Sequence, residues 1–422
     1  PGNHLIYAKD GFVIVTLAWL AMSVIGALPF VISGEMSNYI DAFFETVSGF
    51  TTTGASVLTD VEKMSQGLLF WRSFTHWIGG MGVLVFMMAI LPLAGGQNIY
   101  LLRAESPGPT VGKLVPRMKD TASLLYIIYI SMTVLEMILL IISGMKVFDS
   151  ITLSFGTAGT GGFSVLNSGL SSYTMLQQGI ITVFMIMFGV NFNVYFLLLT
   201  RKTKLALKNE EVCWYFIIIA AAVTIITVNI KGMFPSVGTA FHHSAFQVAS
   251  IITTTGYATV DFNLWPDLSR SVLVLLMFIG ACAGSTGGGI KVSRIILSVK
   301  SVGKELFRFI HPRNVRVLKL DGKKVEHETM RTINTFLFAY MMVFTASVLI
   351  IALDDFDMVT SFTSVAATLN NIGPGLSTIG PMGNFSSFSI LSKCVLMFDM
   401  LTGRLELFPM LLLLVPSTWK RS

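Results

Sequence analysis

Four short segments rich in glycine and threonine interrupt an otherwise apolar chain. They read IDAFFETVSGFTTTGAS from residue 40, FDSITLSFGTAGTGGFS from 148, HSAFQVASIITTTGYAT from 243 and SFTSVAATLNNIGPGLS from 361. Backbone carbonyls of such turns can replace the water shell of a small cation when they meet around one axis. Glycine is needed because a carbonyl directed at the axis requires positive φ at some residues, which costs other residues about 1–2 kcal/mol. The segments therefore predict cation coordination by main-chain oxygens.

The four segments are copies of one unit. Superimposing Ile40 on Phe148 gives an offset of 148 − 40 = 108, which also carries Gly54 onto Gly162 without a gap. The neighbouring Gly161 leaves the register of the second copy open by one residue. The third copy repeats the Thr-Thr-Gly of the first, whereas the fourth diverges. We predict a selectivity filter formed by Thr52, Thr53, Gly54, Gly161, Gly162, Thr254, Thr255, Gly256, Asn371, Ile372 and Gly373.

The chain that holds these segments has the composition of an integral membrane protein. Of its 422 residues, 53% are hydrophobic and 12% are charged, whereas about 25% are charged in an ordinary soluble domain. A helix of about 20 apolar residues crosses the hydrocarbon core of a bilayer. Apolar runs of that length predict eight spans, at 11–33, 68–93, 121–143, 174–200, 212–230, 269–300 (interrupted), 330–353 and 388–415.

Each glycine-containing segment lies between two spans, and its helical part of about 10–12 residues reaches only half-way through the bilayer. Non-helical backbone at that depth must be buried in protein or line a watery cavity. We therefore predict an all-α membrane protein of four pseudo-symmetric repeats, each a helix, a re-entrant pore helix, a filter loop and a second helix, around one central pore. The predicted repeats are 1–100, 101–203, 204–311 with an intramembrane loop, and 312–422.

The net charge of +6 is unevenly distributed. Basic residues gather at 103–119, 201–208, 291–331 and 420–421, all on one side of the predicted spans. The positive-inside rule places that side of the bilayer, and both termini, in the cytoplasm. Topology is favoured over nucleic-acid binding as the reason for these clusters, so no nucleic-acid partner is expected.

The sixth span is interrupted by the run GACAGSTGGGIK. Each glycine inside a helix costs about 1 kcal/mol relative to alanine, so this run predicts an unwound loop beneath the filter. A phosphate-binding loop is disfavoured, because Lys291 comes one residue late for that motif and no strand precedes it. The loop residues are Gly284, Ser285, Thr286, Gly287, Gly288 and Gly289.

Arg404 lies about 16 residues, or roughly 24 Å, into the last span. An ionisable residue at that depth faces the bundle interior or water and is a functional candidate. An ion pair with Glu406 or Asp399 is the alternative. Of the other intramembrane charges, Glu136 is expected to hydrogen-bond between helices, and Lys393 is expected to extend toward the outer interface.

The chain resembles the Trk/Ktr/HKT superfamily of cation transporters and, within it, the TrkH-type subunits of bacterial potassium uptake. The resemblance covers essentially the whole chain. It is carried by the four filter segments and by LRAESPGPTVGKLVPRMKDTA (102–122), GACAGSTGGGIKVSR (280–294) and GRLELFP (403–409). Such proteins usually begin with an additional pair of helices before the first repeat, so this chain is expected to be truncated or incompletely ordered at its start.

The resemblance implies potassium uptake by a multi-pass protein of the bacterial plasma (inner) membrane. The family's filter glycines correspond to Gly54, Gly162, Gly256 and Gly373, whose backbone carbonyls would bind K⁺ as the transported ion, with no cofactor. The resemblance also assigns the glycine-rich loop as the gate and places Arg404 in the pore just below the filter.

The resemblance further implies a homodimer on a cytoplasmic ring of nucleotide-binding regulatory subunits of the TrkA/KtrA type. The chain itself has no soluble domain long enough to bind a regulatory nucleotide. The loops at 201–211 and 301–330 are the predicted docking surfaces.

Two alternatives remain open at this point. A sodium-permeable or poorly selective monovalent cation transporter would use the same residues, because selectivity depends on carbonyl geometry as well as residue identity. An intramembrane enzyme is disfavoured, because the sequence has no HExxH motif and no clear nucleophile–base pair, and its polar residues recur in four turns. Energy coupling also stays open, since channel-like flow and ion-coupled symport would use the same residues.

Overall fold

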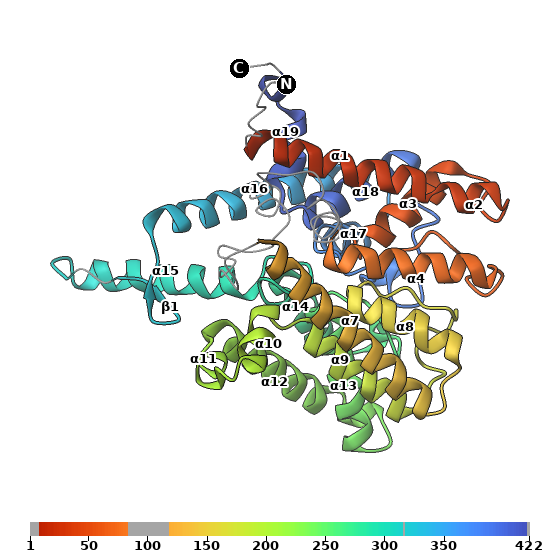
Figure 1. Ribbon diagram of the computed structural model, residues 1–422, viewed down its shortest axis with the longest axis horizontal. Coiled ribbons are helices and arrows are strands. Elements are labelled where there is room, and N and C mark those ends of the chain that lie inside the picture. Colours follow the sequence, from red (N-terminus) through yellow and green to blue (C-terminus); the bar gives the residue numbers. More distant parts are fainter. Residues whose placement is uncertain (1–7, 83–117, 315–316, 420–422) are drawn as a thin grey trace.

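The structure is a computed structural model that describes residues 8–82, 118–314 and 317–419 (Figure 1). In these residues nearly all regular structure is helical. The only strands there are β1 (Lys319–Leu320) and β2 (Lys323–Lys324), which pair as a short antiparallel hairpin. The predicted all-α class is confirmed.

The first two repeats have the predicted order of a long helix, a short re-entrant helix, a turn and a second helix. The first repeat contains α1 (Ala8–Gly26), α2 (Leu28–Ile32), α3 (Tyr39–Phe50) and α4 (Gln66–Met81). The second contains α7 (Met118–Ile142), α8 (Val147–Gly159), α9 (Met175–Phe188) and α10 (Phe192–Leu199), and α11 (Thr203–Leu207) follows it.

The last two repeats keep this order. The third contains α12 (Glu210–Ile230), η2 (Lys231–Met233), α13 (Val237–Ile252), η3 (Phe262–Leu264), α14 (Asp267–Ile279) and α15 (Val292–Ile310). The fourth follows the β-hairpin and contains α16 (His327–Ile351), η4 (Ala352–Asp354), α17 (Met358–Leu369), η5 (Ser377–Ile379), α18 (Ile390–Arg404), α19 (Phe408–Leu414) and η6 (Pro416–Trp419).

The first helix of every repeat is long and apolar enough to cross a membrane. These candidate spans are 11–32, 123–142, 210–233 and 327–354. The second helices are shorter or broken. The predictions of continuous spans at 174–200 and 388–415 are therefore wrong, whereas the predicted interruption of the sixth span lies between α14 and α15.

The two unexpected breaks have different causes, one tertiary and one local. Helices α9 and α10 meet at an angle of 91°, and the Phe192 amide at the start of α10 donates to the Gly284 carbonyl of the glycine-rich loop (3.0 Å). Between α18 and α19, Glu406 and Leu407 adopt left-handed φ values of 58° and 65°, and Pro409 cannot continue a helix that began earlier. An apolar run alone does not reveal such breaks.

The four re-entrant helices α3, α8, α13 and α17 have 12, 13, 16 and 12 residues, so α8 is slightly longer and α13 clearly longer than predicted. Polar side chains begin three of them: Asn38, Ser236 and Asp357 each accept a hydrogen bond from a first-turn amide, which satisfies donors that a helix leaves open. Their buried C-terminal halves point their partly negative ends toward the centre of the bundle.

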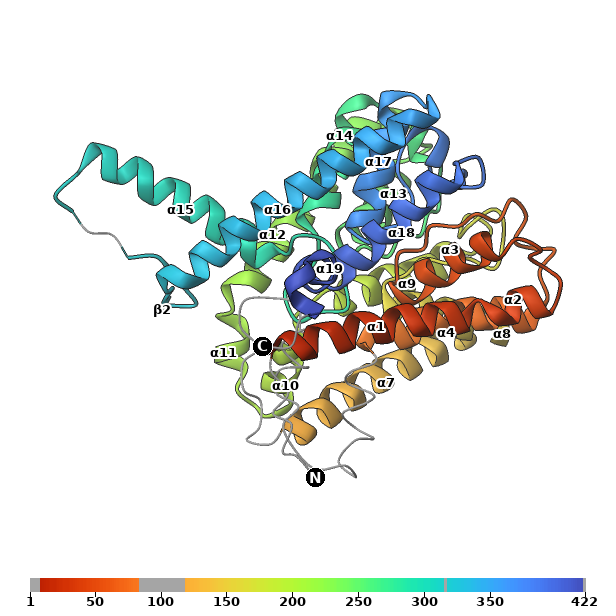
Figure 2. The ribbon, with the colours of Figure 1, turned by 90° about the horizontal axis from the view of Figure 1, so that it is seen from above.

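The repeats pack around a common centre. Helix α4 packs against α8, α13 against α9, α14 against α17, and α18 against α3, so each repeat contacts the next and the fourth contacts the first. Figures 1 and 2 show the four repeats grouped in this way, with α15 and the β-hairpin projecting from the rest of the molecule.

Candidate functional site

The four predicted filter segments share one backbone conformation. In each, the first residue of a three-residue turn is left-handed although it is not glycine, at Thr52, Thr160, Thr254 and Asn371, with φ between 54° and 60°. The third residue is a glycine with φ between 78° and 95°, at Gly54, Gly162, Gly256 and Gly373. We call 52–54, 160–162, 254–256 and 371–373 the ring turns. The second copy thus aligns through Gly162, and Thr160 is a member that the sequence analysis missed.

The same long hydrogen bond closes every ring turn. In the first, the Thr53 amide donates to the carbonyl of Ser48, five residues earlier, at 2.8 Å. The equivalent bonds run from Gly161 to Gly156, from Thr255 to Ser250 and from Ile372 to Ala367, all at 2.8 Å. This six-to-one bond is the pattern that ends a helix through a left-handed residue. Each turn is therefore a C-terminal cap of its re-entrant helix.

The ring turns form a closed ring in chain order. A Cβ atom added to Gly54 would overlap the Gly161 carbonyl oxygen of the second repeat. The same overlap joins Gly162 to the Thr255 oxygen, Gly256 to the Ile372 oxygen, and Gly373 to the Thr53 oxygen. Each glycine thus lies against the middle carbonyl of the next turn, and the fourth closes onto the first. Glycine is required here both by its φ and by the close approach of this carbonyl.

Side chains behind the ring hold the turns in place. The Thr51 and Thr53 hydroxyls lie 2.8 Å apart, and those of Thr253 and Thr255 repeat the arrangement at 2.8 Å. In the divergent fourth turn, the Asn371 amide nitrogen donates to the Thr53 hydroxyl (3.0 Å) and to the Met400 carbonyl (2.8 Å). Asparagine also tolerates the left-handed conformation better than most residues.

A buried ion pair supports the first and second turns, and the sequence analysis missed it. Arg72 of α4 and Glu45 of α3 lie 2.7 Å apart and are almost fully buried. Glu45 also accepts from the Ser56 hydroxyl (3.0 Å), while Arg72 donates to the Ser164 carbonyl of the second repeat (3.2 Å). The sequence could have indicated this ion pair. Glu45 and Arg72 have opposite charges and lie within predicted membrane segments, where charged side chains pair with one another.

His76 of α4 is a second residue that the sequence analysis missed. Its Nδ1 atom is 2.8 Å from the Gly49 carbonyl oxygen, and its Nε2 atom accepts from the Phe163 amide (3.3 Å). A Cβ atom on Gly161 would overlap the ring of His76. The imidazole therefore fills the space behind the second turn.

The predicted loop between α14 and α15 is non-helical and lies directly against the ring. We call residues 280–291 the glycine loop. Its Gly288 amide donates to the Thr254 hydroxyl (2.6 Å), and its Thr286 carbonyl accepts from the Thr160 hydroxyl (3.0 Å). A Cβ atom on Gly288 would overlap the Asn370 carbonyl oxygen. The consecutive glycines therefore allow the loop to contact three of the four repeats.

Arg404, at the end of α18, holds the glycine loop to the first repeat. Its guanidinium donates to the Thr286 carbonyl (2.9 Å) and to the carbonyls of Gly79 and Gly80 in α4, the latter at 3.1 Å. The two acids considered as its partners make other bonds. Glu406 forms an ion pair with Arg294, and the Asp399 carboxylate accepts from the Ser347 hydroxyl (2.8 Å).

The two other intramembrane charges are both buried, and the expectation for Lys393 is wrong. Lys393 does not extend to the interface, because its side chain is 8% exposed and forms an ion pair with Asp41 of α3 (2.7 Å). Glu136 of α7 is fully buried beside Thr157 of α8, and the expected hydrogen bond between helices stays a prediction. The motif at 102–122 and the basic residues at 103–117 lie largely outside the described residues, so the structure gives no account of them.

Comparisons with known proteins agree with this architecture. The family model TrkH, described as "Cation transport protein", matches residues 2–421. The "Trk system potassium uptake protein TrkH" of Salmonella typhimurium is 38% identical over 419 residues, which is 98% of this chain and 86% of that protein. Its counterpart in Vibrio parahaemolyticus is 37% identical over 99% of this chain and 87% of its own length.

A solved structure is similar over nearly the whole chain. The crystal structure of the potassium transporter TrkH from Vibrio parahaemolyticus superimposes with a TM-score of 0.88 and 34% identity. The match covers 99% of this chain and 87% of that one.

Proposed function

This chain belongs to the TrkH family of cation transport proteins, and we propose that it takes up potassium ions across a bacterial plasma membrane through the centre of the ring turns. The observation that carries the proposal is the closed sequence of glycine and carbonyl contacts from the first turn to the fourth and back to the first. A cation on the axis would meet equivalent main-chain oxygens from every repeat, which replace its hydration shell. This role requires K⁺ as the transported ion and no resident cofactor.

Tracer uptake tests this proposal. Purified protein in liposomes should take up rubidium tracer in response to an imposed gradient, and external K⁺ should compete with the tracer at roughly tenfold lower concentration than Na⁺. Equal competition by the two ions would favour the poorly selective alternative. Absence of tracer uptake in every condition, including with a shortened glycine loop, would exclude transport through the ring.

We propose that the glycine loop and Arg404 form the gate below the ring. The loop occupies the space beneath the turns through its bonds to Thr160 and Thr254, and the Arg404 guanidinium lies against it. Two like charges about 4–6 Å apart repel by roughly 3–4 kcal/mol at an effective dielectric constant of about 20. A passing cation would therefore meet both a steric and an electrostatic barrier in this position of the loop.

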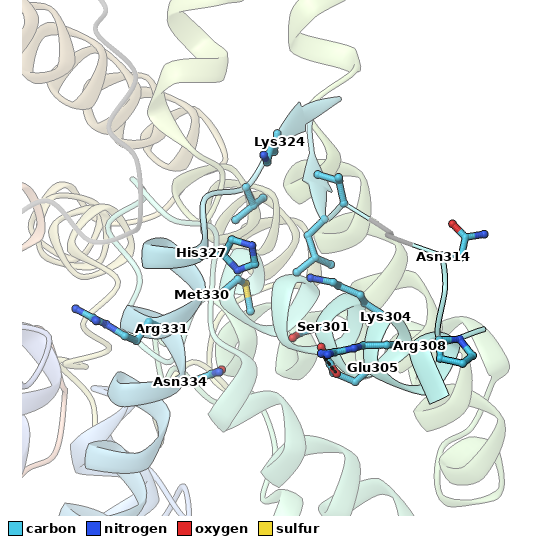
Figure 3. Close-up of a pocket in the computed structure, with 14 residues that line it drawn as sticks. Ser301, Lys304, Glu305, Arg308, Asn314, Lys324, His327, Met330, Arg331 and Asn334 are labelled. Carbon is cyan, nitrogen blue, oxygen red and sulfur yellow. Dashed lines mark ion pairs between the residues drawn. The ribbon is translucent and has the colours of Figure 1, made fainter. Parts of the chain in front are cut away.

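We propose that the basic side of the molecule is cytoplasmic and docks a ring of nucleotide-binding regulatory subunits. A cavity of about 710 Å³ lies there between α15, the β-hairpin and α16. Figure 3 shows Lys304 and Arg308 on α15 and His327 on α16 around it. Its basic lining suits acidic groups of a partner.

A binding assay tests the docking surface. Replacing Lys304, Arg308 and Arg313 together by alanine should weaken capture of the regulatory subunit. The difference from the parent should be largest at low salt and shrink as salt concentration rises, because salt screens exposed charge contacts in the parent. Undiminished capture would exclude this loop as the docking surface.

We propose that the exposed apolar face of α15 joins two copies of the chain. Its members recur every three or four residues and are 59–83% exposed: Val299, Val302, Leu306, Phe309 and Ile310. Such a continuous apolar face marks an interaction surface. Phe309→Glu should convert the purified dimer into monomers in a mass measurement, whereas Leu264→Glu, at a similarly exposed position in η3, should not. A dimer that persists in Phe309→Glu would place the interface elsewhere.

A further inference from the structure

A single carboxylate oxygen holds both ends of the glycine loop. Oε1 of Glu211, in the first turn of α12, accepts hydrogen bonds from the Ala283 amide (2.7 Å) and from the Ser293 amide (3.0 Å). Ala283 directly precedes the glycine-rich run 284–289, and Ser293 follows the loop in the first turn of α15. The Glu211 side chain is only 5% exposed, so water competes little for these bonds.

The residue beside Glu211 is bonded to the part of the molecule that projects from the bundle. The Glu210 carboxylate forms an ion pair with Lys300 of α15, and the Glu210 amide donates to the Asp321 side chain at the tip of the β-hairpin (2.6 Å). Lys300 in turn donates to the Lys319 carbonyl of β1 (2.9 Å). The hairpin, α15 and the start of α12 therefore form one bonded unit next to Glu211.

We propose that Glu211 is the positioning residue that keeps the glycine loop under the ring, and that it transmits movement of the β-hairpin and α15 to the loop. This inference rests on the proposed role of the loop as a gate. Glu211 adds a side-chain anchor to the backbone bonds that close the base of the loop, such as the one from the Val292 amide to the Ala281 carbonyl (3.1 Å). Above this base, Thr286 and Gly288 bond to Thr160 and Thr254. Displacement of α15 by a docked partner would pull the Ser293 amide away from Oε1 and remove one of the bonds that hold this end.

Glu211 holds the loop through its oxygen acceptor and not through its negative charge. Both bonds go to Oε1, so glutamine can keep a carbonyl oxygen in the same place, whereas aspartate is one methylene too short and alanine has no acceptor. Loss of one such bond should change the closed-to-open ratio by roughly two- to tenfold, and loss of both should change it by about tenfold or more.

The test measures tracer flux without the regulatory subunit in liposomes that contain the full chain. Glu211→Ala and Glu211→Asp should each raise flux at least about tenfold, and Glu211→Gln should stay near the parent. The matched control is Glu328→Ala, which removes the same group from the first turn of α16, where its side chain is exposed. The control should leave flux unchanged.

Amide hydrogen exchange provides a readout that does not depend on transport. The amides of Ala283 and Ser293 should exchange faster in Glu211→Ala and Glu211→Asp than in the parent and in Glu211→Gln. If Glu211→Gln behaves like Glu211→Ala in either measurement, or if exchange at both amides is unchanged in Glu211→Ala, the inference is wrong. If exchange changes as expected but no variant conducts the tracer, the proposed transport fails while the positioning role of Glu211 stands.

Discussion

The ring turns are built alike in all four repeats, whereas among the described residues the glycine loop occurs in the third repeat only. Each turn has a left-handed residue and a glycine at the same two positions, and the same 2.8 Å backbone bond. The glycine loop is instead held by unlike groups: Arg404 of the fourth repeat, which also bonds to α4 of the first, and the hydroxyls of Thr160 and Thr254 in the second and third turns.

This difference follows from what each region is proposed to do. An ion on the axis needs a full shell of oxygens, so every repeat must contribute an equivalent group. Blocking the axis needs one obstacle, so a single repeat suffices and its fixing residues need not recur. The repeated structure of the ring turns therefore favours a role in ion coordination, and the unrepeated contacts of the glycine loop favour a role in gating.

The largest expected effect is at the ring. Gly54→Ser places a side chain against the Gly161 carbonyl at a residue with φ of 78°, so one quarter of the ring must distort. Potassium uptake should fall by about tenfold or more, and sodium uptake should rise relative to it, since strain of several kcal/mol falls on the coordinating carbonyl. Uptake of both ions by a potassium-uptake-deficient strain measures this.

Gly179→Ala is the control for that substitution, because nothing lies within 4 Å of a Cβ atom added in this part of α9. It should leave uptake of both ions unchanged. An unaltered ratio of the two ions in Gly54→Ser would show that the first turn does not coordinate the ion.

The next effect is at the gate and has the opposite sign. Deletion of Gly287–Gly289 or the change Arg404→Ala should each raise rubidium flux about tenfold or more without the regulatory subunit, because each removes part of the barrier. The double variant should gain less than the product of the two single gains, since both changes relieve one constriction. Folded, dimeric single variants that conduct no faster than the parent would place the constriction elsewhere.

A smaller effect should separate two turns that are otherwise alike. Thr254→Val removes the hydroxyl that accepts from the Gly288 amide, and a hydrogen bond of about 0.5–1.5 kcal/mol corresponds to a flux increase of roughly two- to tenfold. Thr52→Val makes the same change at the equivalent position of the first turn and should not raise flux without the regulatory subunit. Equal increases in both variants would show that the asymmetry of the loop contacts does not matter.

The smallest effect concerns the outer contact between the first two repeats. The Asn167 amide donates to Asp60 (2.8 Å), and this bond holds the pKa of the Asp60 carboxyl below its usual value. Because the pKa is lowered in the folded state, this contribution is present above the unfolded pKa of about 3.9 and is lost as pH falls through the lower folded value. The melting temperature of the parent should therefore fall below about pH 4, and in Asp60→Asn this fall should be smaller by a few degrees at most. If the melting temperature depends on pH identically in parent and variant, this bond does not contribute to stability.

The sequence was sufficient to predict the elements that depend on local pattern. The offset of 108 residues between Gly54 and Gly162 and the run of glycines after Gly284 both indicated non-helical turns, and the structure has them there. Backbone conformation at such sites depends on which residues tolerate positive φ, and that property belongs to the residue itself. The apolar runs likewise predicted the first helix of each repeat, because bilayer thickness sets the length of an uninterrupted span.

Only the tertiary structure decided which distant groups meet. The sequence left the second turn open between Gly161 and Gly162, offered Glu406 or Asp399 to Arg404, and gave no sign that Glu211 reaches Ala283 and Ser293. The contacts of Arg404 with Gly80 and of Arg72 with Ser164 join residues that are 324 and 92 positions apart. The packing of the repeats around the axis decides which of these distant residues meet. Residue types alone do not, because any buried carbonyl can accept a hydrogen bond from an arginine, so several different partners would satisfy the same side chain.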